Sequence, residues 1–132
     1  MVLAQGGDAN VLTDRHRLVG ESEKLVVRAS VGGWVAGLDA LRIGRVAAEL
    51  GASRSSAGTV VDGSAGVRIV SRVGCEVSAG DAVLELRSAD HRRLERAESL
   101  AMSAIEIVDA PGVLRELVLG RIDASTLDES NR

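Results

Sequence analysis

A serine in a glycine-rich turn is the first candidate for catalysis in this 132-residue chain. The run Asp62-Gly63-Ser64-Ala65-Gly66 is close to G-x-S-x-G, the pattern that exposes a nucleophilic serine between a strand and a helix. Asp62 replaces the first glycine, and the residues that follow predict another strand rather than a helix. The histidine of a triad would have to be His16, in a polar connection, or His91, in the first turn of a predicted helix. A plain β-turn is therefore favoured over a hydrolase site.

Metal and thiolate chemistry are disfavoured by the scarcity of ligands. His16 and His91 lie 75 positions apart, without the paired spacing or clustered carboxylates of a metal site, and are expected to be solvated. Cys75 is the only cysteine, which excludes an internal disulfide and a zinc site built from several thiolates. Glu76 beside it disfavours the thiolate. We expect no catalytic residue, no metal and no cofactor in this chain.

Two segments have the composition of an anion site. The run Gly51-Ala52-Ser53-Arg54-Ser55-Ser56 has the small residues of a phosphate loop, but it follows the C-terminus of a predicted helix, where the helix dipole is negative. A basic cluster opens the last predicted helix, formed by Arg87, Arg92, Arg93 and Arg96. It is either a patch for an anion or acidic partner, or a solvated face, and the solvated face is favoured.

A covalent carrier function is a further possibility. The segment from Gly74 to Leu86 resembles the turn-rich strands of biotinyl and lipoyl carrier domains. A carrier needs a lysine at an exposed hairpin tip for attachment of its prosthetic group. The single lysine, Lys24, is predicted to start a strand, which argues against this function and leaves a similar local fold open.

Short apolar runs between glycines predict the elements that position these residues. Strands are predicted over 24–29, 34–38, 60–61, 67–70, 82–86 and 113–118, with a tight excursion over 73–77. Helices are predicted over 40–50 and 90–109, capped by Asp39 and Asp90, and close backbone packing is expected at Gly44. Residues 1–12 resemble the end of a helix that runs into Gly6. The order β-β-α-β-β-β-α-β predicts an α+β domain with a mixed sheet and two main helices.

Composition narrows the function classes. Trp34 is the one aromatic residue, so stacking of bases or sugars on aromatic platforms is disfavoured. The formal net charge is −3, with fifteen arginines and one lysine outweighed by acidic residues, which argues against nucleic acid as a partner. No apolar run approaches the roughly 18 residues of a spanning helix, and no export signal is visible, so no membrane partner and a cytoplasmic location are expected.

The order of motifs along the chain resembles the C-terminal part of thymidine and pyrimidine nucleoside phosphorylases. The first residues that carry this resemblance are Gln5-Gly6-Gly7-Asp8, Gly33-Trp34-Val35, Leu38-Asp39-Ala40, Ile43-Gly44 and Leu50-Gly51-Ala52-Ser53-Arg54. They continue with Val61-Asp62, Ala65-Gly66-Val67, Val73-Gly74, Val77, Gly80-Asp81 and Leu84. The resemblance covers roughly residues 1–119. Ser53 stands where the family usually has glycine, and Arg87-Ser88 where a His-Ala pair is common.

The resemblance implies a β-hammerhead-like domain, related to the barrel sandwich, within a larger enzyme. Residues 1–12 would end the last helix of a preceding catalytic α/β domain, 13–120 would form the C-terminal domain, and 121–132 a polar, disordered tail. The parent would be a homodimeric, metal-independent enzyme that binds phosphate and a pyrimidine nucleoside and releases free base and (deoxy)ribose 1-phosphate. The family's catalytic groups lie in the two earlier domains, so none is carried over to this chain.

The leading hypothesis is therefore a structural domain that packs on the catalytic domains of a phosphorylase and is inactive alone. Since the family dimerises mainly through an earlier domain, the isolated chain is expected to be a monomer or weak dimer. The alternative is a stand-alone binding or interaction module that uses the same fold without catalysis. A sequence preceding Met1 with a phosphate-loop signature would distinguish the two hypotheses.

Overall fold

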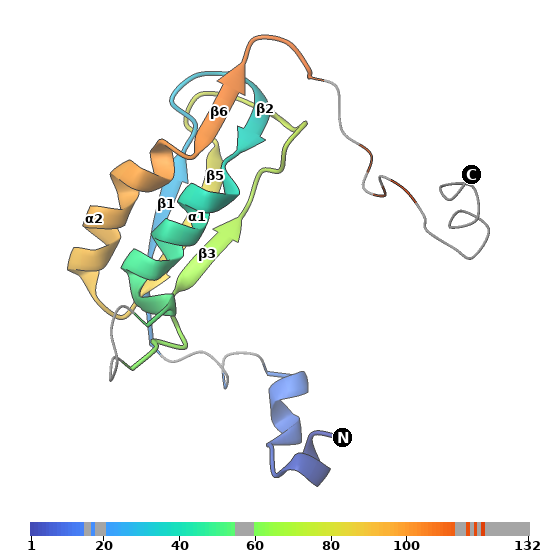
Figure 1. Cartoon of the computed structure of the whole chain (residues 1–132), viewed down its shortest axis with the longest axis vertical. Helices are drawn as coiled ribbons and strands as arrows, with labels where there is room; N and C mark the ends of the chain where they lie inside the picture. The colour runs from blue at the N-terminus through green and yellow to red at the C-terminus, as the bar shows by residue number, and fades with distance from the viewer. Residues whose placement is uncertain are drawn as a thin grey trace, which may run out of the picture.

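Two small sheets and two helices make up the fold in the computed structural model (Figure 1). The structure describes residues 1–14, 17, 21–54, 60–112, 116, 118 and 120. The strands are β1 (Glu23–Arg28), β2 (Gly33–Leu38), β3 (Gly66–Ile69), β4 (Glu76–Val77), β5 (Ala82–Ser88) and β6 (Ile105–Val108). The helices are α1 (Ala40–Ala47), continued by a wider turn, η4 (Ala48–Ala52), and α2 (His91–Met102). Two short 3₁₀ turns, η1 (Leu3–Gln5) and η2 (Ala9–Leu12), precede them.

The first sheet has the order β1-β5-β3 and is antiparallel throughout. Its register places Leu86 between Leu25 on β1 and Val67 on β3. Because side chains alternate across a strand, Leu84 shares the face of Leu86. Helix α2 contacts β1 and β5, and α1 contacts β3, so both helices pack on one side of this sheet.

The second sheet has the order β4-β2-β6 and is also antiparallel. Trp34 on β2 lies opposite Val108 on β6 and Glu76 on β4. Gly33 has φ of 147°, and a Cβ there would lie 2.4 Å from the Val108 carbonyl oxygen, so this close approach of strands requires glycine.

The core is aliphatic and joins both sheets to both helices. Its fully buried large side chains are Val27, Val35, Val46, Leu50, Val83, Leu84, Leu86 and Leu94. The predicted caps of the helices are confirmed: Asp39 accepts a hydrogen bond from the Arg42 amide, and Asp90 from the Arg92 amide. These bonds satisfy amides that a helix start leaves unpaired.

The predicted order β-β-α-β-β-β-α-β is found in the structure, but two of its strands lie at other residues. The helix predicted to reach Asp109 ends at Met102, where the Ser103 hydroxyl donates to the Leu100 carbonyl at 2.7 Å. The prediction of helix over 105–108 is wrong because these residues form β6, which pairs with β2. Apolar residues at 104, 105 and 108 satisfied helical spacing, whereas the β-branched residues of Ile105–Val108 fit a pleated sheet.

The strand predicted over 60–61 is also wrong. The Asp62 amide donates to the Gly51 carbonyl at 3.0 Å, which ties this segment to the end of η4 rather than to a sheet edge. Within the predicted excursion over 73–77, Glu76–Val77 forms the short strand β4.

Instead of the predicted mixed sheet, the described residues form two antiparallel sheets. The strand predicted over 113–118 lies largely outside the described residues, and Glu116 and Val118 are not in a strand.

Two glycines illustrate different outcomes. Gly6 adopts φ of 77° and ends η1, as predicted for a left-handed cap, although the turn before it is 3₁₀ rather than α-helical. At Gly44 the expected close packing is absent, because a Cβ there would meet nothing within 4 Å beyond the backbone of its own helix. The α+β class is confirmed.

Candidate functional site

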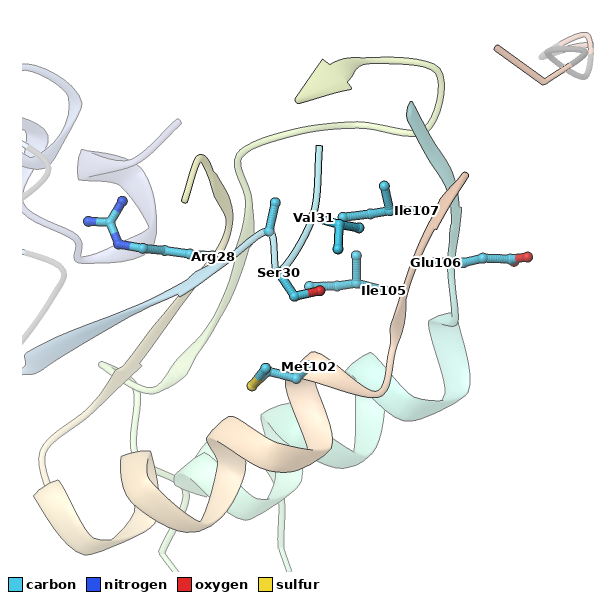
Figure 2. A pocket seen from close by; sticks show the side chains of 8 residues that line it. Arg28, Ser30, Val31, Met102, Ile105, Glu106 and Ile107 are labelled. Atoms are coloured by element: carbon cyan, nitrogen blue, oxygen red, sulfur yellow. The ribbon is translucent and has the colours of Figure 1, made fainter. Parts of the chain in front are cut away.

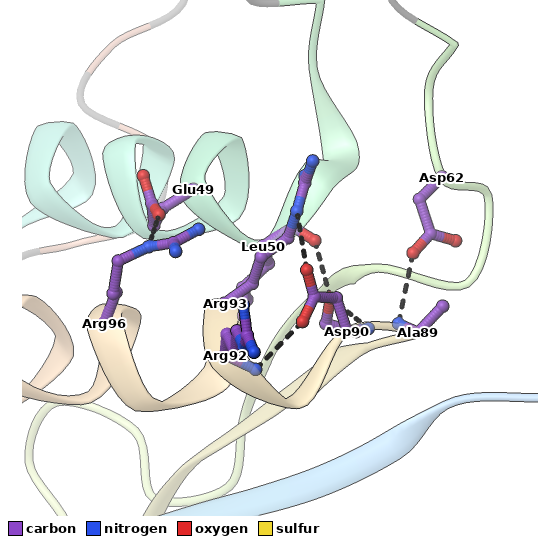
Figure 3. Close-up of polar contacts among 9 residues, drawn as sticks. Glu49, Leu50, Asp62, Ala89, Asp90, Arg92, Arg93 and Arg96 are labelled. Atoms are coloured by element: carbon purple, nitrogen blue, oxygen red, sulfur yellow. Dashed lines mark hydrogen bonds and ion pairs between the residues drawn. The ribbon is translucent and has the colours of Figure 1, made fainter.

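Segments distant in the sequence meet where η4 ends, β5 ends and α2 begins (Figure 3). We call this place the junction and define it by Leu50, Gly51, Asp62, Ser88 and Asp90. Several of these residues belong to the motifs singled out above, so the junction is the candidate functional site of the described chain.

Ser88 is the buried centre of the junction. Its hydroxyl donates to the Leu50 carbonyl at 2.8 Å and accepts from the Asp90 amide at 3.2 Å. The end of β5 is thereby bonded to the end of η4 and to the cap of α2. With both bonds made, the hydroxyl is a structural tie rather than a nucleophile.

Asp62 makes the second tie. Its carboxylate accepts from the Ser64 hydroxyl at 2.6 Å, the Ser64 amide at 2.9 Å and the Ala89 amide at 3.2 Å. These bonds lower the pKa of Asp62, with the Ser64 hydroxyl as the main cause, so the carboxylate is ionised at neutral pH. The turn at Gly63 is thus bonded to the start of α2.

Gly51 allows the backbone at the end of η4 to lie close to the side chains of Arg93 and Asp62. Its φ is 111°, a conformation that L residues rarely adopt. A Cβ at this position would lie 2.7 Å from Nη1 of Arg93 and 3.3 Å from Cβ of Asp62. Glycine is required here for the wider turn η4 to end against α2.

The structure confirms the β-turn and gives no support for a hydrolase at Ser64. The Ser64 hydroxyl donates to Asp62, and the described residues place no histidine against it. The ring of His91 instead contacts Glu23 on β1 at 2.7 Å and Glu95 at 3.6 Å. Hydrogen bonding to Glu23, and then the negative charges of Glu23 and Glu95, raise the pKa of His91. His16 lies outside the described residues.

The described residues also give no support for a metal site, a reactive cysteine or a phosphate loop. Within the described part of the chain, no three His, Cys, Asp or Glu side chains gather as metal ligands. Cys75 is free and exposed, and its carbonyl accepts from the Val35 amide at 2.9 Å. The helical segment before Ser53 ends at Ala52, so the run from Gly51 to Arg54 follows a helix C-terminus as predicted, and residues 55–56 are not described.

The four clustered arginines do not form one patch. Arg96 is bonded to Glu49 at 2.6 Å, and Arg93 lies 3.8 Å from Asp90 (Figure 3). Arg87 is on β5 and bonds Glu85 at 2.9 Å. Arg92 is exposed. The structure therefore separates Arg87 from the three arginines of α2.

Lys24 lies within β1, opposite Arg87, and 3.7 Å from a carboxylate oxygen of Glu85. It is not at a hairpin tip, which agrees with the argument against a carrier.

An open hollow of about 340 Å³ lies between the loop after β1 and β6 (Figure 2). Ile105, Ile107 and Val31 surround it, while Arg28 and Glu106 point away to opposite sides, so it presents no convergent polar groups.

Comparison with known proteins explains why these motifs occur together. The family model described as the pyrimidine nucleoside phosphorylase C-terminal domain matches residues 34–108, more than half of the chain. The chain belongs to this family. Its match begins at Trp34 and ends at Val108, two residues that face each other in the ladder between β2 and β6.

Curated relatives agree with this assignment. A thymidine phosphorylase of Mycobacterium tuberculosis is 34% identical over 122 residues, which cover 92% of this chain and 27% of the relative. An AMP phosphorylase of Pyrococcus horikoshii is 30% identical over 114 residues, covering 86% and 21%. A thymidine phosphorylase of Mesorhizobium japonicum is 29% identical over 124 residues, covering 92% and 28%. The chain spans between a fifth and a third of the length of these relatives.

Sequence reasoning missed the structural roles of Ser88 and Glu23. In the sequence Ser88 stands out only as a departure from a common His-Ala pair, and nothing in its neighbourhood predicts that it is buried against Leu50, 38 positions away. Glu23 and His91 are 68 positions apart, and their contact depends on the pairing of β1 with β5. Alternation in β1 was the available signal, but it does not identify the partner strand.

Proposed function

We propose that this chain is a structural domain of a pyrimidine nucleoside phosphorylase whose reactive groups lie in other domains. The observation that carries this proposal is the junction, where Ser88 and Asp62 make hydrogen bonds between elements and Gly51 allows their close packing. Ser88, Asp62 and Gly51 all hold elements together, and within the described residues no histidine lies against the hydroxyl of Ser64 or Ser88.

In the proposed parent, phosphate attacks the anomeric carbon of a pyrimidine nucleoside as the glycosidic bond breaks. The products are the free base and a (deoxy)ribose 1-phosphate. This domain would pack on the catalytic α/β domain and stiffen it, so that closure between domains brings phosphate and nucleoside together. The names of the curated relatives, two thymidine phosphorylases and an AMP phosphorylase, support the phosphorylase class.

The proposed organisation places residues 1–12 at the end of the last helix of the catalytic domain and residues 13–120 in the C-terminal domain, with 121–132 as a tail. The left-handed Gly6 that ends η1 supports a helix end in this region. The barrel-sandwich-related hammerhead remains part of the proposal, as do a homodimeric parent and a cytoplasmic location. None of the described helices has the length and apolar character needed to cross a membrane.

An assay of the isolated chain tests this proposal. The chain is incubated with thymidine or uridine and inorganic phosphate, and release of free base is followed by chromatography. The M. tuberculosis thymidine phosphorylase serves as the positive control. We expect no base above the enzyme-free blank, because the residues that the structure describes assemble no reactive group. Turnover that is retained through purification and lost on heat denaturation would contradict the proposal.

A further inference from the structure

One face of the first sheet carries a cationic group that the junction does not use. Its register sets Lys24 opposite Arg87, and Arg68 opposite Glu85. Since side chains alternate across each strand, all four lie on the face opposite to the core residues Leu84 and Leu86. We call these four residues the basic face. It lies on the side of the sheet away from α1 and α2 (Figure 1).

A single carboxylate organises three cations in the basic face. The side chain of Glu85 is 9% exposed; its Oε1 accepts from Nε of Arg87 at 2.9 Å and also lies 2.9 Å from Nη2 of Arg87. Its Oε2 lies 3.7 Å from Nζ of Lys24 and 3.8 Å from Nη1 of Arg68. Burial raises the pKa of Glu85, but the Arg87 hydrogen bond and the charges of the three cations outweigh it and lower the pKa. One negative and three positive charges leave a local excess of two positive charges.

Arg68 and Lys24 keep their hydrogen-bond donors available. Both nitrogen–oxygen distances to Glu85 exceed hydrogen-bond length, so these contacts are electrostatic only. The Arg68 side chain is 71% exposed and, within the described residues, donates to no other acceptor. Its planar guanidinium has five N–H donors in a geometry that matches a carboxylate or phosphate group.

A hollow of about 310 Å³ adjoins the basic face. It is lined by residues of the turn and of β3, Gly63 to Arg68, together with Glu85 and Arg87 of β5. Gly66 lies directly opposite Arg87 on the neighbouring strand, and a Cβ there would meet nothing within 4 Å. The missing side chain therefore leaves open space beside a guanidinium. The carboxylate of Asp62, on the same turn, is engaged by Ser64 and Ala89.

We propose that this hollow binds a phosphate group, either free or esterified to a small polar molecule, through Arg68 and Arg87 beside the small residues Gly63 to Gly66. Lys24 adds attraction at longer range. The hollow is lined by no aromatic side chain, so a stacked nucleobase is not the ligand recognised. This site does not depend on the proposed structural role in a phosphorylase and would hold equally for a stand-alone module.

Titration of the full ¹⁵N-labelled chain at low ionic strength tests the site. Inorganic phosphate and glycerol 3-phosphate are added separately, and amide shifts are fitted to a dissociation constant. Saturable shifts are expected at Gly63, Ser64, Gly66 and Arg68. Tighter binding of the ester would assign the hollow to a phosphate ester, and equal binding would assign it to free phosphate, and either outcome supports the site.

Two variants separate a specific site from diffuse attraction. Arg68→Gln removes the positive charge and the planar guanidinium while leaving Glu85 paired with Arg87, and should weaken binding about 10-fold. Gly66→Val fills the hollow without changing charge and suits a strand, and should weaken binding by a comparable factor. Arg45→Gln makes the same charge change on α1, where Arg45 is exposed, and should leave the affinity unchanged.

Three results would overturn the proposal. One is the absence of saturable shifts in the hollow while the spectrum shows a folded chain. Another is an unchanged affinity in folded Gly66→Val, and the third is an equal loss in Arg45→Gln and Arg68→Gln.

Discussion

At the scale of single residues, the buried Ser88 and the exposed His91 both join one end of the first sheet to neighbouring elements. Ser88 is polar yet fully buried, and it is accommodated because its hydroxyl has both a donor and an acceptor partner. His91 is exposed, and its ring forms a 2.7 Å hydrogen bond with Glu23 and lies 3.6 Å from Glu95. Because Glu23 and Ser88 pair across β1 and β5, both sets of contacts act at the same end of the first sheet. The contacts of Ser88 are buried hydrogen bonds, whereas that of His91 is an exposed contact with a carboxylate.

Ser88→Ala should destabilise the chain by about 1–3 kcal/mol, since it removes a buried donor from the Leu50 carbonyl. The substitution is a sharp test because alanine is the residue that the family resemblance makes common at this position. The free energy of unfolding is measured by urea denaturation. Ser103→Ala removes a similar bond to the Leu100 carbonyl on an exposed helix end and should cost less than about 0.5 kcal/mol. Equal losses in the two variants would contradict the role of burial.

His91 should make stability depend on pH. Its pKa in the folded chain lies above the ordinary value of 6.5, so its contacts with Glu23 and Glu95 stabilise the fold fully below that value. The contribution is lost as pH rises through the raised pKa. As the pH rises from about 5.5 to about 8.5, the urea midpoint should fall more for the unsubstituted chain than for His91→Gln. In NMR titrations, Glu23→Gln should return the pKa of His91 toward 6.5. An equal pH dependence of the urea midpoint in the unsubstituted chain and in His91→Gln would contradict this role of His91.

At the scale of elements, the sequence predicts best where one local rule acts alone. Asp39 and Asp90 cap their helices as expected, and the turn at Gly63 follows from short-range chemistry. The prediction failed over 105–108, where apolar spacing satisfied a helix while β-branched side chains favoured a strand. The outcome was decided by β2, which supplies the pairing edge about 70 residues earlier in the chain.

Gly44→Ala should stabilise the chain by about 0.5–1 kcal/mol, because glycine is unfavourable inside a helix and the added Cβ meets open space. Gly51→Ala is the matched comparison at the end of the same helical segment. It should destabilise by more than about 1 kcal/mol, since φ is 111° and the new Cβ approaches Arg93 and Asp62. Both changes are measured as shifts in urea midpoint. Stabilisation by Gly51→Ala would show that η4 ends in another conformation.

At the scale of the whole molecule, family membership could be inferred from the order of weak motifs, whereas the site could not. Nothing in the sequence showed that Gly51, Asp62 and Ser88 meet. That meeting depends on pairing of β5 with both β1 and β3, which brings the end of β5 under η4. Long-range register of this kind is weakly specified by local pattern.

We propose that this chain supplies structure to a phosphorylase. The most direct test replaces the aligned C-terminal region of the M. tuberculosis thymidine phosphorylase with this chain and measures phosphorolysis of thymidine. The same relative truncated before that region is the control. We predict that the chimera releases thymine at well above the rate of the truncated control, and that Gly51→Ala within the chimera lowers its melting temperature. A folded, soluble chimera with no more activity than the truncated control would contradict the claim.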